Sequence, residues 1–266
     1  MDKINDTSLD TLCAALAYAM GIKAPEFAAA PNKDLCEYID KELDGEKVDR
    51  ILMYNPDAIS QWVYEKYPIL FRGMIDRVDL HIPFCTVMPS VTPVCFGTMY
   101  TGAQPEVHGI RRYEKPVIKI ETIFDALIKA GKKPAIVADC ECSIGKIFLE
   151  RDMDYFIFKN GDEILAKTVE LIIKDEYDFI VVYQGNYDST MHKYGPESIE
   201  ALAELRYNTK AYSMLDSLVK EHWKNHRTLI GFAMDHGAHE IDGGCGSHGL
   251  DMPEDLNIVH HYKIHK

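Results

Sequence analysis

The sequence predicts an α/β protein, a three-layer α/β/α sandwich in which helices cover both faces of a mostly parallel sheet. Short, continuously apolar runs recur along the chain, as expected of strands that are buried on both faces. Stretches with helical periodicity separate these runs. Such alternation of strands and helices is typical of parallel sheets.

Four apolar runs, each bounded by charged or turn-forming residues, predict buried strands; they are residues 50–54, 134–138, 179–183 and 228–234. Apolar residues at helical spacing predict helices between them, at about 120–130, 162–174 and 196–222. Two more helices are expected before the first strand. The first is capped by Ser8 and ended by Gly21, with one apolar face made of Leu9, Leu12, Cys13, Leu16 and Met20. The second follows Asn32 and covers about 33–43.

The chain length of 266 residues and the lack of a repeat or a flexible linker predict one catalytic domain, residues 1–266. Residues 1–47 are expected to form an N-terminal helical extension of it. Whether these helices cover the core, shape a pocket or make a dimer contact is open, as is the oligomeric state.

The charge balance excludes several classes of partner. There are 29 Lys and Arg against 42 Asp and Glu, a formal charge of −13, so we expect binding neither to nucleic-acid polymers nor to anionic membranes. The first residues lack the apolar core of a signal peptide, and no window reaches the roughly 18 apolar residues of a membrane helix. With seven scattered cysteines, we expect a cytoplasmic protein with reduced thiols.

Aspartate and histidine residues follow three of the predicted strands. They are Asp57 after the first strand, Asp188 and His192 after the third, and Asp235, His236 and His248 after the fourth. Parallel strands bring their carboxyl ends to one edge of a sheet, where ligands bind. Asp and His together suit zinc or manganese, and six such ligands indicate two ions. Taken alone, each residue is equally typical of a turn or a helix cap.

Thr92 precedes Pro93, which suits the first position of a helix reaching about Tyr100, so Thr92 is expected at the N-cap. The free N–H groups and the dipole of the helix favour a phosphate there. A hydroxyl nucleophile needs activation, for which metal coordination is available. The alternative is that Thr92 is an ordinary cap.

Together these segments resemble the alkaline phosphatase superfamily, most closely its nucleotide pyrophosphatase and phosphodiesterase branch. The resemblance covers the chain from about Val48 onward and depends on the order of several motifs. These are an aspartate after the first strand, Pro89-Ser-Val-Thr-Pro93, Thr101-Gly-Ala-Gln-Pro-Glu-Val-His-Gly-Ile110, Asp188-x3-His192 with Gly195-Pro196, Asp235-His236-Gly237 and His248-Gly249.

The resemblance implies an alkaline-phosphatase-like fold and two divalent metal ions, zinc or alternatively manganese. One ion would be held by Asp188, His192 and His248. The other would be held by Asp57, Asp235, His236 and the oxygen of Thr92. The family mechanism implies that Thr92 attacks phosphorus and forms a phospho-threonine that water hydrolyses. A hydrolase of small phosphate esters follows, favouring phosphodiester or nucleotide pyrophosphate bonds.

The sequence departs from the family pattern in three ways. The first strand is followed by Asn55-Pro56-Asp57-Ala58 instead of Asp-Gly, so Asp57 is the expected ligand and Asn55 the alternative. Cys95 stands where related phosphodiesterases carry an Asn that holds a phosphate oxygen. The insertions that select substrates in the family are expected to be small or missing.

Alternative functions are a phosphomonoesterase, a metal-dependent phosphotransferase or mutase, and a scaffold that binds without catalysis. A monoesterase needs an extra cation that the sequence does not place. Sulfatase chemistry is disfavoured because the run after Cys95 lacks the required Pro and Arg.

Other residues have both a functional and a structural interpretation. Cys245 could bind zinc but is more typical of a turn. Cys140 and Cys142 could bind a metal too, but after a strand end they are more typical of packing and a loop. His108 is expected to be structural, and His239 to orient a ligand. The side chains of Arg111, Arg112, Lys193 and Tyr194 could hold the rest of a substrate or simply face solvent. We expect His260, His261 and His265 to form a solvated end.

Overall fold

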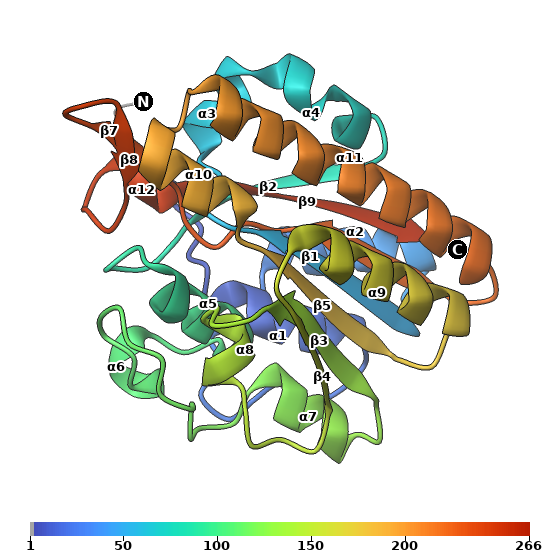
Figure 1. Cartoon of the computed structure of the whole chain (residues 1–266). Helices are drawn as coiled ribbons and strands as arrows, with labels where there is room; N and C mark the ends of the chain where they lie inside the picture. The colour runs from blue at the N-terminus through green and yellow to red at the C-terminus, as the bar shows by residue number, and fades with distance from the viewer. Residues whose placement is uncertain (1–2) are drawn as a thin grey trace.

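The computed structural model describes residues 3–266, and over these residues seven strands form one sheet in the order β2-β9-β6-β1-β5-β3-β4 (Figure 1). The strands are β1 Arg50–Pro56, β2 Leu80–Cys85, β3 Pro134–Asp139, β4 Asp154–Phe158, β5 Phe179–Gln184, β6 Thr228–Phe232 and β9 Asn257–His265. Neighbours from β6 to β4 pair in parallel, whereas β9 is antiparallel to both β6 and β2. The sheet is therefore mostly parallel, which confirms the predicted fold class.

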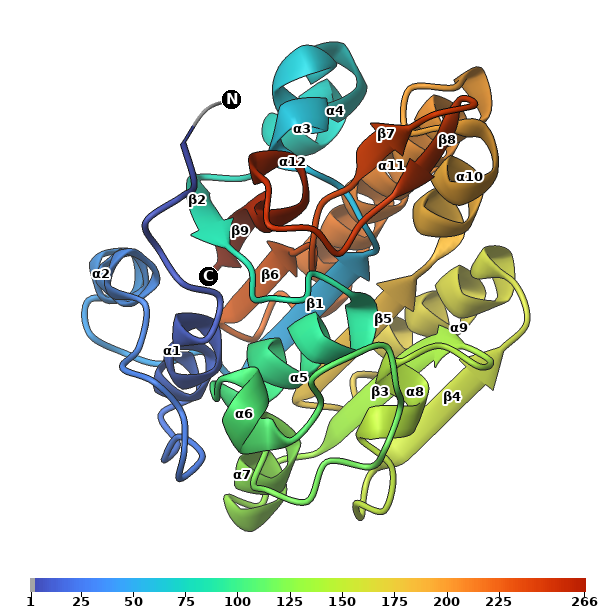
Figure 2. The same ribbon diagram turned by 90° about the vertical axis from the view of Figure 1, so that its left-hand side faces the viewer.

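Helices cover both faces of this sheet (Figures 1 and 2). One layer contains α3 Gln61–Lys66, α4 Pro68–Ile75, α9 Gly161–Lys174, α10 Asn186–Tyr194 and α11 Ile199–His222. The other contains α1 Thr11–Ala19, α2 Lys33–Leu43, α5 Thr92–Thr101, α6 Pro105–His108, α7 Ile123–Lys129 and α8 Ile144–Ile147. A two-stranded hairpin, β7 His239–Ile241 and β8 Cys245–Ser247, and the short helix α12 Pro253–Leu256 lie between β6 and β9 in the sequence.

The four predicted strands are present because their apolar runs are covered on both sides. Every residue of β5 and β6 is buried, and β1 is buried from Ile51 onward. Strands β2 and β4 were missed because they are the edge strands of the sheet and only partly buried, and β2 contains Pro83.

The expectation that His260, His261 and His265 form a solvated end is wrong. They belong to β9, which lies inside the sheet, and both His260 and His261 are fully buried. His260 donates from Nε2 to the carbonyl of Met234 at 2.6 Å, and His265 lies 2.7 Å from Asp216. A strand rich in His was not recognisable as apolar, although imidazole is readily buried once it is hydrogen-bonded.

The second N-terminal helix matches its prediction, since α2 begins after Asn32, whose side chain accepts the N–H of Leu35 at 2.9 Å. The first does not. Ser8 forms a bridge to Cys85 instead of a cap, and α1 begins at Thr11 and is buried around almost its whole circumference. It packs against α5 and α7, so it completes a helical layer instead of exposing one face.

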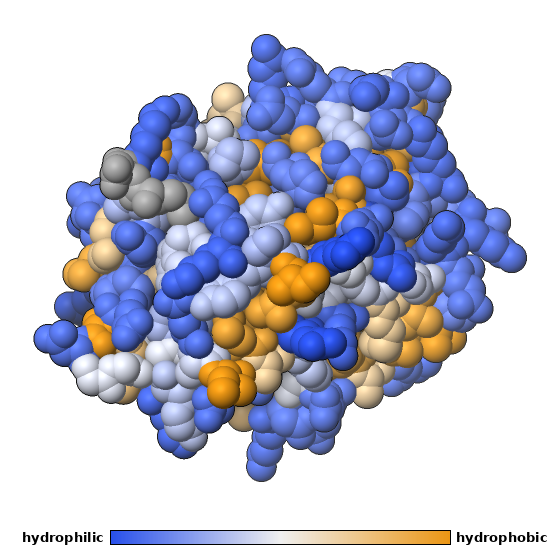
Figure 3. Space-filling model, turned by 90° about the horizontal axis from the view of Figure 1, so that it is seen from above, coloured by the Kyte–Doolittle hydropathy of each residue, from blue (hydrophilic) through white to orange (hydrophobic). Residues whose placement is uncertain are grey.

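The outer face of the layer that contains α4 and α11 is mostly hydrophilic with scattered apolar side chains (Figure 3). The exposed apolar residues on these helices include Ile69, Ile199 and Met214. Within residues 3–266, no helix combines the length and hydropathy that crossing a bilayer requires.

Buried His260 predicts a loss of stability in acid. Burial lowers its pKa from 6.5 to about 4. Between these values the unfolded chain binds a proton that the folded chain does not, so stability is present above pH 6.5 and is lost towards pH 4. The free energy of unfolding, measured with urea, should fall between pH 7 and pH 5. We expect this fall to be about 2 kcal/mol smaller in His260→Gln than in wild type. The matched control, His222→Gln at the end of α11, keeps the wild-type loss. If His260→Gln loses as much free energy of unfolding between pH 7 and pH 5 as wild type does, buried His260 is not the cause of the loss.

Candidate metal centre

The topology brings the predicted ligands to the carboxyl edge of the sheet. Asp57 directly follows β1, and its N–H donates to Gln184 at the end of the neighbouring β5 at 3.0 Å. The helix α10, which carries Asp188 and His192 one turn apart, begins directly after β5. Asp235 and His236 follow β6. β2 points to the same edge, because it is antiparallel to β9 and β9 is antiparallel to β6, and it leads into the segment that carries Thr92.

The six predicted ligands form two groups of three. Asp188, His192 and His248 form one group, and Asp57, Asp235 and His236 form the other; within each group the ligand atoms lie within 4.8 Å of one another. In the first group, Asp188 Oδ1 lies 3.2 Å from His192 Nε2 and 3.4 Å from His248 Nε2. In the second, His236 Nε2 lies 3.3 Å from an oxygen of each aspartate. The groups adjoin, since the rings of His236 and His248 are 4.1 Å apart.

The backbone fixes all three imidazole rings in the same way. Nδ1 of His192, His236 and His248 lies 3.0, 2.9 and 2.9 Å from the carbonyl oxygens of Gly246, Gly237 and Ser90. A carbonyl oxygen only accepts, so each ring donates from Nδ1. Each Nε2 therefore turns towards the carboxylates, and in a neutral imidazole it carries the lone pair that binds metal.

One oxygen of each aspartate has no hydrogen-bond partner although it is buried: Asp57 Oδ1, Asp188 Oδ1 and Asp235 Oδ2. The other oxygens of Asp57 and Asp235 are held by Tyr183 and by the N–H of Ala58. The unpartnered oxygens face imidazole Nε2 atoms, so acceptors face acceptors. Such an arrangement is stabilised by a proton or a metal ion between them, and the donor set of carboxylate oxygen and imidazole nitrogen fits zinc or manganese.

Protons are the alternative to a metal ion. Burial, and then the charge of Asp188, raises the pKa of Asp57 to about 7, and burial raises that of Asp235 well above its usual value. The carboxylate of Asp188, 3.2 Å away, raises the pKa of His192 to about 9, whereas burial lowers that of His236 to about 3. A metal ion must displace these protons, so metal affinity falls as the pH falls.

Thr92 lies against the second group. Its Oγ1 is 3.4 Å from Asp57 Oδ2 and 3.3 Å from His236 Nε2. The expectation that Thr92 is the N-cap is wrong by one residue, because extended Val91 is the cap and Thr92 begins α5. The N–H groups of Val94 and Cys95 both donate to the Val91 carbonyl at 3.0 Å. Because Pro93 has no N–H, few helix donors remain for a phosphate.

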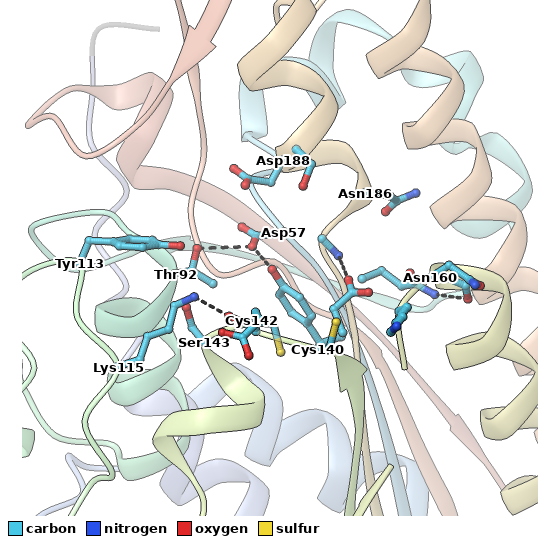
Figure 4. Close-up of a pocket in the computed structure, with 18 residues that line it drawn as sticks. Asp57, Thr92, Tyr113, Lys115, Cys140, Cys142, Ser143, Asn160, Asn186 and Asp188 are labelled. Carbon is cyan, nitrogen blue, oxygen red and sulfur yellow. Dashed lines mark hydrogen bonds between the residues drawn. The ribbon is translucent and has the colours of Figure 1, made fainter. Parts of the chain in front are cut away.

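A cavity of about 400 Å³ opens beside Thr92, Asp57 and Asp188 (Figure 4). Tyr113 and Lys115 lie on the Thr92 side, and Asn160 and Asn186 on the opposite side. Further wall residues come from the ends of β3, β4 and β5 and from the loop after β3; they include Asp139, Cys140, Cys142, Lys159 and Gln184. The cavity is large enough for a small substrate.

Asn55, the alternative ligand, lies inside β1. Its side chain donates to the Ala233 carbonyl at 2.6 Å and accepts from the Tyr100 hydroxyl at 2.6 Å, so it belongs to neither group. Tyr183 was missed by the sequence analysis. Its hydroxyl donates to Asp57, and no motif distinguished it from other apolar strand residues.

The other sequence candidates lie outside both groups. Cys245 begins β8 directly after the turn instead of lying in it, and its Sγ faces the Lys193 carbonyl at 3.6 Å. His108 shares a 3.1 Å hydrogen bond with Thr98, consistent with a structural role. His239 pairs with Asp255 at 2.7 Å and, in the part of the chain described, makes no hydrogen bond or ion pair with a member of either group.

The four candidates for holding a substrate are not among the residues that line the cavity. Lys193 lies over the ring of Tyr194, Arg112 pairs with Glu114, and Arg111 bonds the Glu106 carbonyl at 3.3 Å. Instead, Tyr113 and Lys115 from the same loop face the cavity.

No protein-family model and no curated protein matches the sequence, but solved structures share the fold. Murine ectonucleotide pyrophosphatase/phosphodiesterase 5 matches with a TM-score of 0.59 and 18% identity, over 73% of this chain and 58% of that one. The human protein matches with a TM-score of 0.58 and 17% identity, over 73% of this chain and 58% of that one. Phosphonoacetate hydrolase from Sinorhizobium meliloti 1021 matches with a TM-score of 0.57 and 18% identity, over 74% of this chain and 59% of that one.

This chain therefore spans less than two thirds of the length of these structures. At 17–18% identity they show the fold, so the fold that the resemblance implies is confirmed.

The two groups predict two separable metal sites. After loading with zinc and dialysis, we expect about two ions per chain in wild type and about one in Asp188→Asn and in Asp235→Asn, measured by mass spectrometry. Chelation should lower the melting temperature, because the ions bind only the folded chain. The control variant Asp152→Asn, an exposed carboxylate, keeps both ions. Loss of both ions in either variant, or one ion in wild type, contradicts two independent sites.

Proposed function

We propose that the protein is a two-metal-dependent hydrolase of phosphate esters, favouring phosphodiester or nucleotide pyrophosphate bonds, with Thr92 as its nucleophile. The observation that carries the proposal is the position of the Thr92 hydroxyl against Asp57 and His236, at the mouth of a substrate-sized cavity. One group, Asp188, His192 and His248, would hold one ion, and Asp57, Asp235, His236 and Thr92 would hold the other. When bound, the ions would neutralise phosphoryl charge and lower the pKa of the nucleophile.

The reaction would proceed in two balanced steps. Thr92 Oγ1 forms a bond to phosphorus while the bond from phosphorus to the leaving oxygen breaks, and the leaving group takes up the proton that Thr92 loses. The oxygen of a water molecule then forms a bond to phosphorus while the bond from phosphorus to Thr92 Oγ1 breaks; one proton of the water restores the Thr92 hydroxyl, and the other stays with the phosphate product. Thr92 is the first residue of α5, so the helix holds its oxygen in one place for both steps.

The neighbouring structures support this choice of substrates. One of them is an ectonucleotide pyrophosphatase/phosphodiesterase whose inactive variant was solved in complex with AMP, and another is a phosphonoacetate hydrolase. The proposal for this chain is a small nucleotide or another small phosphate ester as the substrate.

We further propose that residues 1–266 act as one catalytic domain in which the helices before residue 47 support the nucleophile. Helix α1 packs on α5, and at the end of α5 the left-handed Gly102 lies against Ala28 and Cys13. A side chain at Gly102 would clash with Ala28, because an added Cβ would lie 2.7 Å from its Cβ.

Replacing the nucleophile tests the function. We expect the metal-loaded protein to hydrolyse bis(p-nitrophenyl) phosphate, and Thr92→Ala to lower kcat by roughly a thousandfold or more, as removal of a covalent nucleophile does. Thr98→Ala, in the same helix but outside the cavity, is the matched control and should retain turnover. Unchanged turnover in Thr92→Ala would overturn the assignment, and absence of metal-dependent turnover on any phosphate ester would overturn the function.

A further inference from the structure

Lys115 places a positive charge in the cavity on the side of the nucleophile. The loop that carries it, residues 109–122, joins α6 to α7 and is anchored behind the cavity. There the N–H of Ile118 donates to the Ile147 carbonyl at 2.8 Å, and the Arg151 guanidinium donates to the Ile118 carbonyl at 3.0 Å. Figure 4 shows the Lys115 side chain directed into the cavity below Thr92.

The Lys115 ammonium group keeps its charge available. It donates to the Glu141 carbonyl at 2.6 Å and lies over the ring of Tyr113 at 5.3 Å. The carboxylate of Glu141 pairs with Lys146 instead. Throughout residues 3–266, no carboxylate lies within ion-pair distance of Lys115. An ammonium group has three donors, so two remain for a ligand.

The nucleophile helix leaves a need for such a donor. Cys95, three residues after Thr92, offers no donor to the cavity, because it is fully buried and its Sγ turns towards the Val87 carbonyl. The N–H groups of Val94 and Cys95 are used within the helix start, and Pro93 has none. Beyond the N–H of Thr92, donors on this side of the cavity come from other segments, where Tyr113, Lys115 and Ser143 line it and Lys115 is the one with a positive charge.

The charges in the cavity indicate what this donor would recognise. Asp57, Asp139, Glu141 and Asp188 line it together with only two basic residues, Lys115 and Lys159. Three aspartates in the two groups already offset much of the charge of two divalent ions. A phosphoryl group with two negative charges needs one more cation than a diester does, and its additional non-bridging oxygen needs a donor.

We propose that Lys115 binds a non-bridging phosphoryl oxygen and thereby gives the site a further activity, hydrolysis of phosphomonoesters. This inference rests on the proposed function and extends its substrate class. A diester carries an alkyl or aryl group on the oxygen that a monoester offers to Lys115, so Lys115 contributes to monoester recognition far more than to diester recognition.

The first test measures binding, without turnover. Titration calorimetry would compare methyl phosphate, a dianion at pH 8, with dimethyl phosphate, a monoanion, on metal-loaded Thr92→Ala protein. Adding Lys115→Met should weaken the binding of methyl phosphate about 10- to 100-fold, which is the range for the loss of one hydrogen bond to a charged group. The affinity for dimethyl phosphate should fall less than roughly threefold, since this ligand lacks the second negative charge and the additional non-bridging oxygen. Lys115→Arg should restore part of the affinity.

Lys119→Met is the matched control, because Lys119 lies four residues further along the same loop and pairs with Glu150 at 2.6 Å outside this cavity. It should leave both affinities unchanged. Equal weakening of both ligands by Lys115→Met, no weakening of either, or the same effect from Lys119→Met would overturn the inference.

A kinetic comparison separates this inference from the proposed function. In otherwise wild-type protein, Lys115→Met should reduce kcat/KM for p-nitrophenyl phosphate more than for bis(p-nitrophenyl) phosphate. If diester turnover depends on Thr92 but neither binding nor monoester turnover depends on Lys115, the inference fails and the function stands. If methyl phosphate binding depends on Lys115 but no ester is hydrolysed, the function fails and the assignment of Lys115 as a phosphoryl-binding residue stands.

Discussion

The buried acceptors at the carboxyl edge of the sheet are the constraint on which the rest of the site depends. Three carboxylate oxygens without hydrogen-bond partners face three imidazoles whose Nδ1 atoms are turned to backbone carbonyls. Folding has to bring these groups together against their own repulsion. A cation offsets that cost, so metal binding and the stability of this edge are expected to be coupled. The same arrangement places the Thr92 oxygen beside Asp57 and His236, where a metal ion held by their group would act on it.

The sheet topology is what allows this concentration of charge. Side chains separated by nearly 200 positions converge because β1, β5 and β6 are adjacent and parallel, and their ends lie at one edge. The antiparallel β9 has a less obvious role. By lying between β6 and β2 it turns β2 towards the same edge, so that the segment after β2 delivers Thr92 to the ligands. Helix α1 then supports the helix that Thr92 begins.

The sequence predicted the central strands and the members of both groups because each depends on local signals. The apolar runs of β1, β5 and β6 are continuous, and polar residues follow them directly. It did not predict β9, because buried His260 and His261 are stabilised by Met234, two residues after β6, and by His81 of β2. It also selected Arg111 and Arg112 over Lys115, because the direction of a loop side chain depends on distant anchors such as Ile147 and Arg151.

The most direct test of the proposed two-metal centre is anomalous diffraction from crystals of zinc-loaded protein, recorded on both sides of the zinc absorption edge. The account predicts two peaks per chain, one among Asp188, His192 and His248 and one among Asp57, Asp235 and His236, roughly 4 Å apart as in two-metal sites. A single peak, or peaks away from these residues, would contradict it.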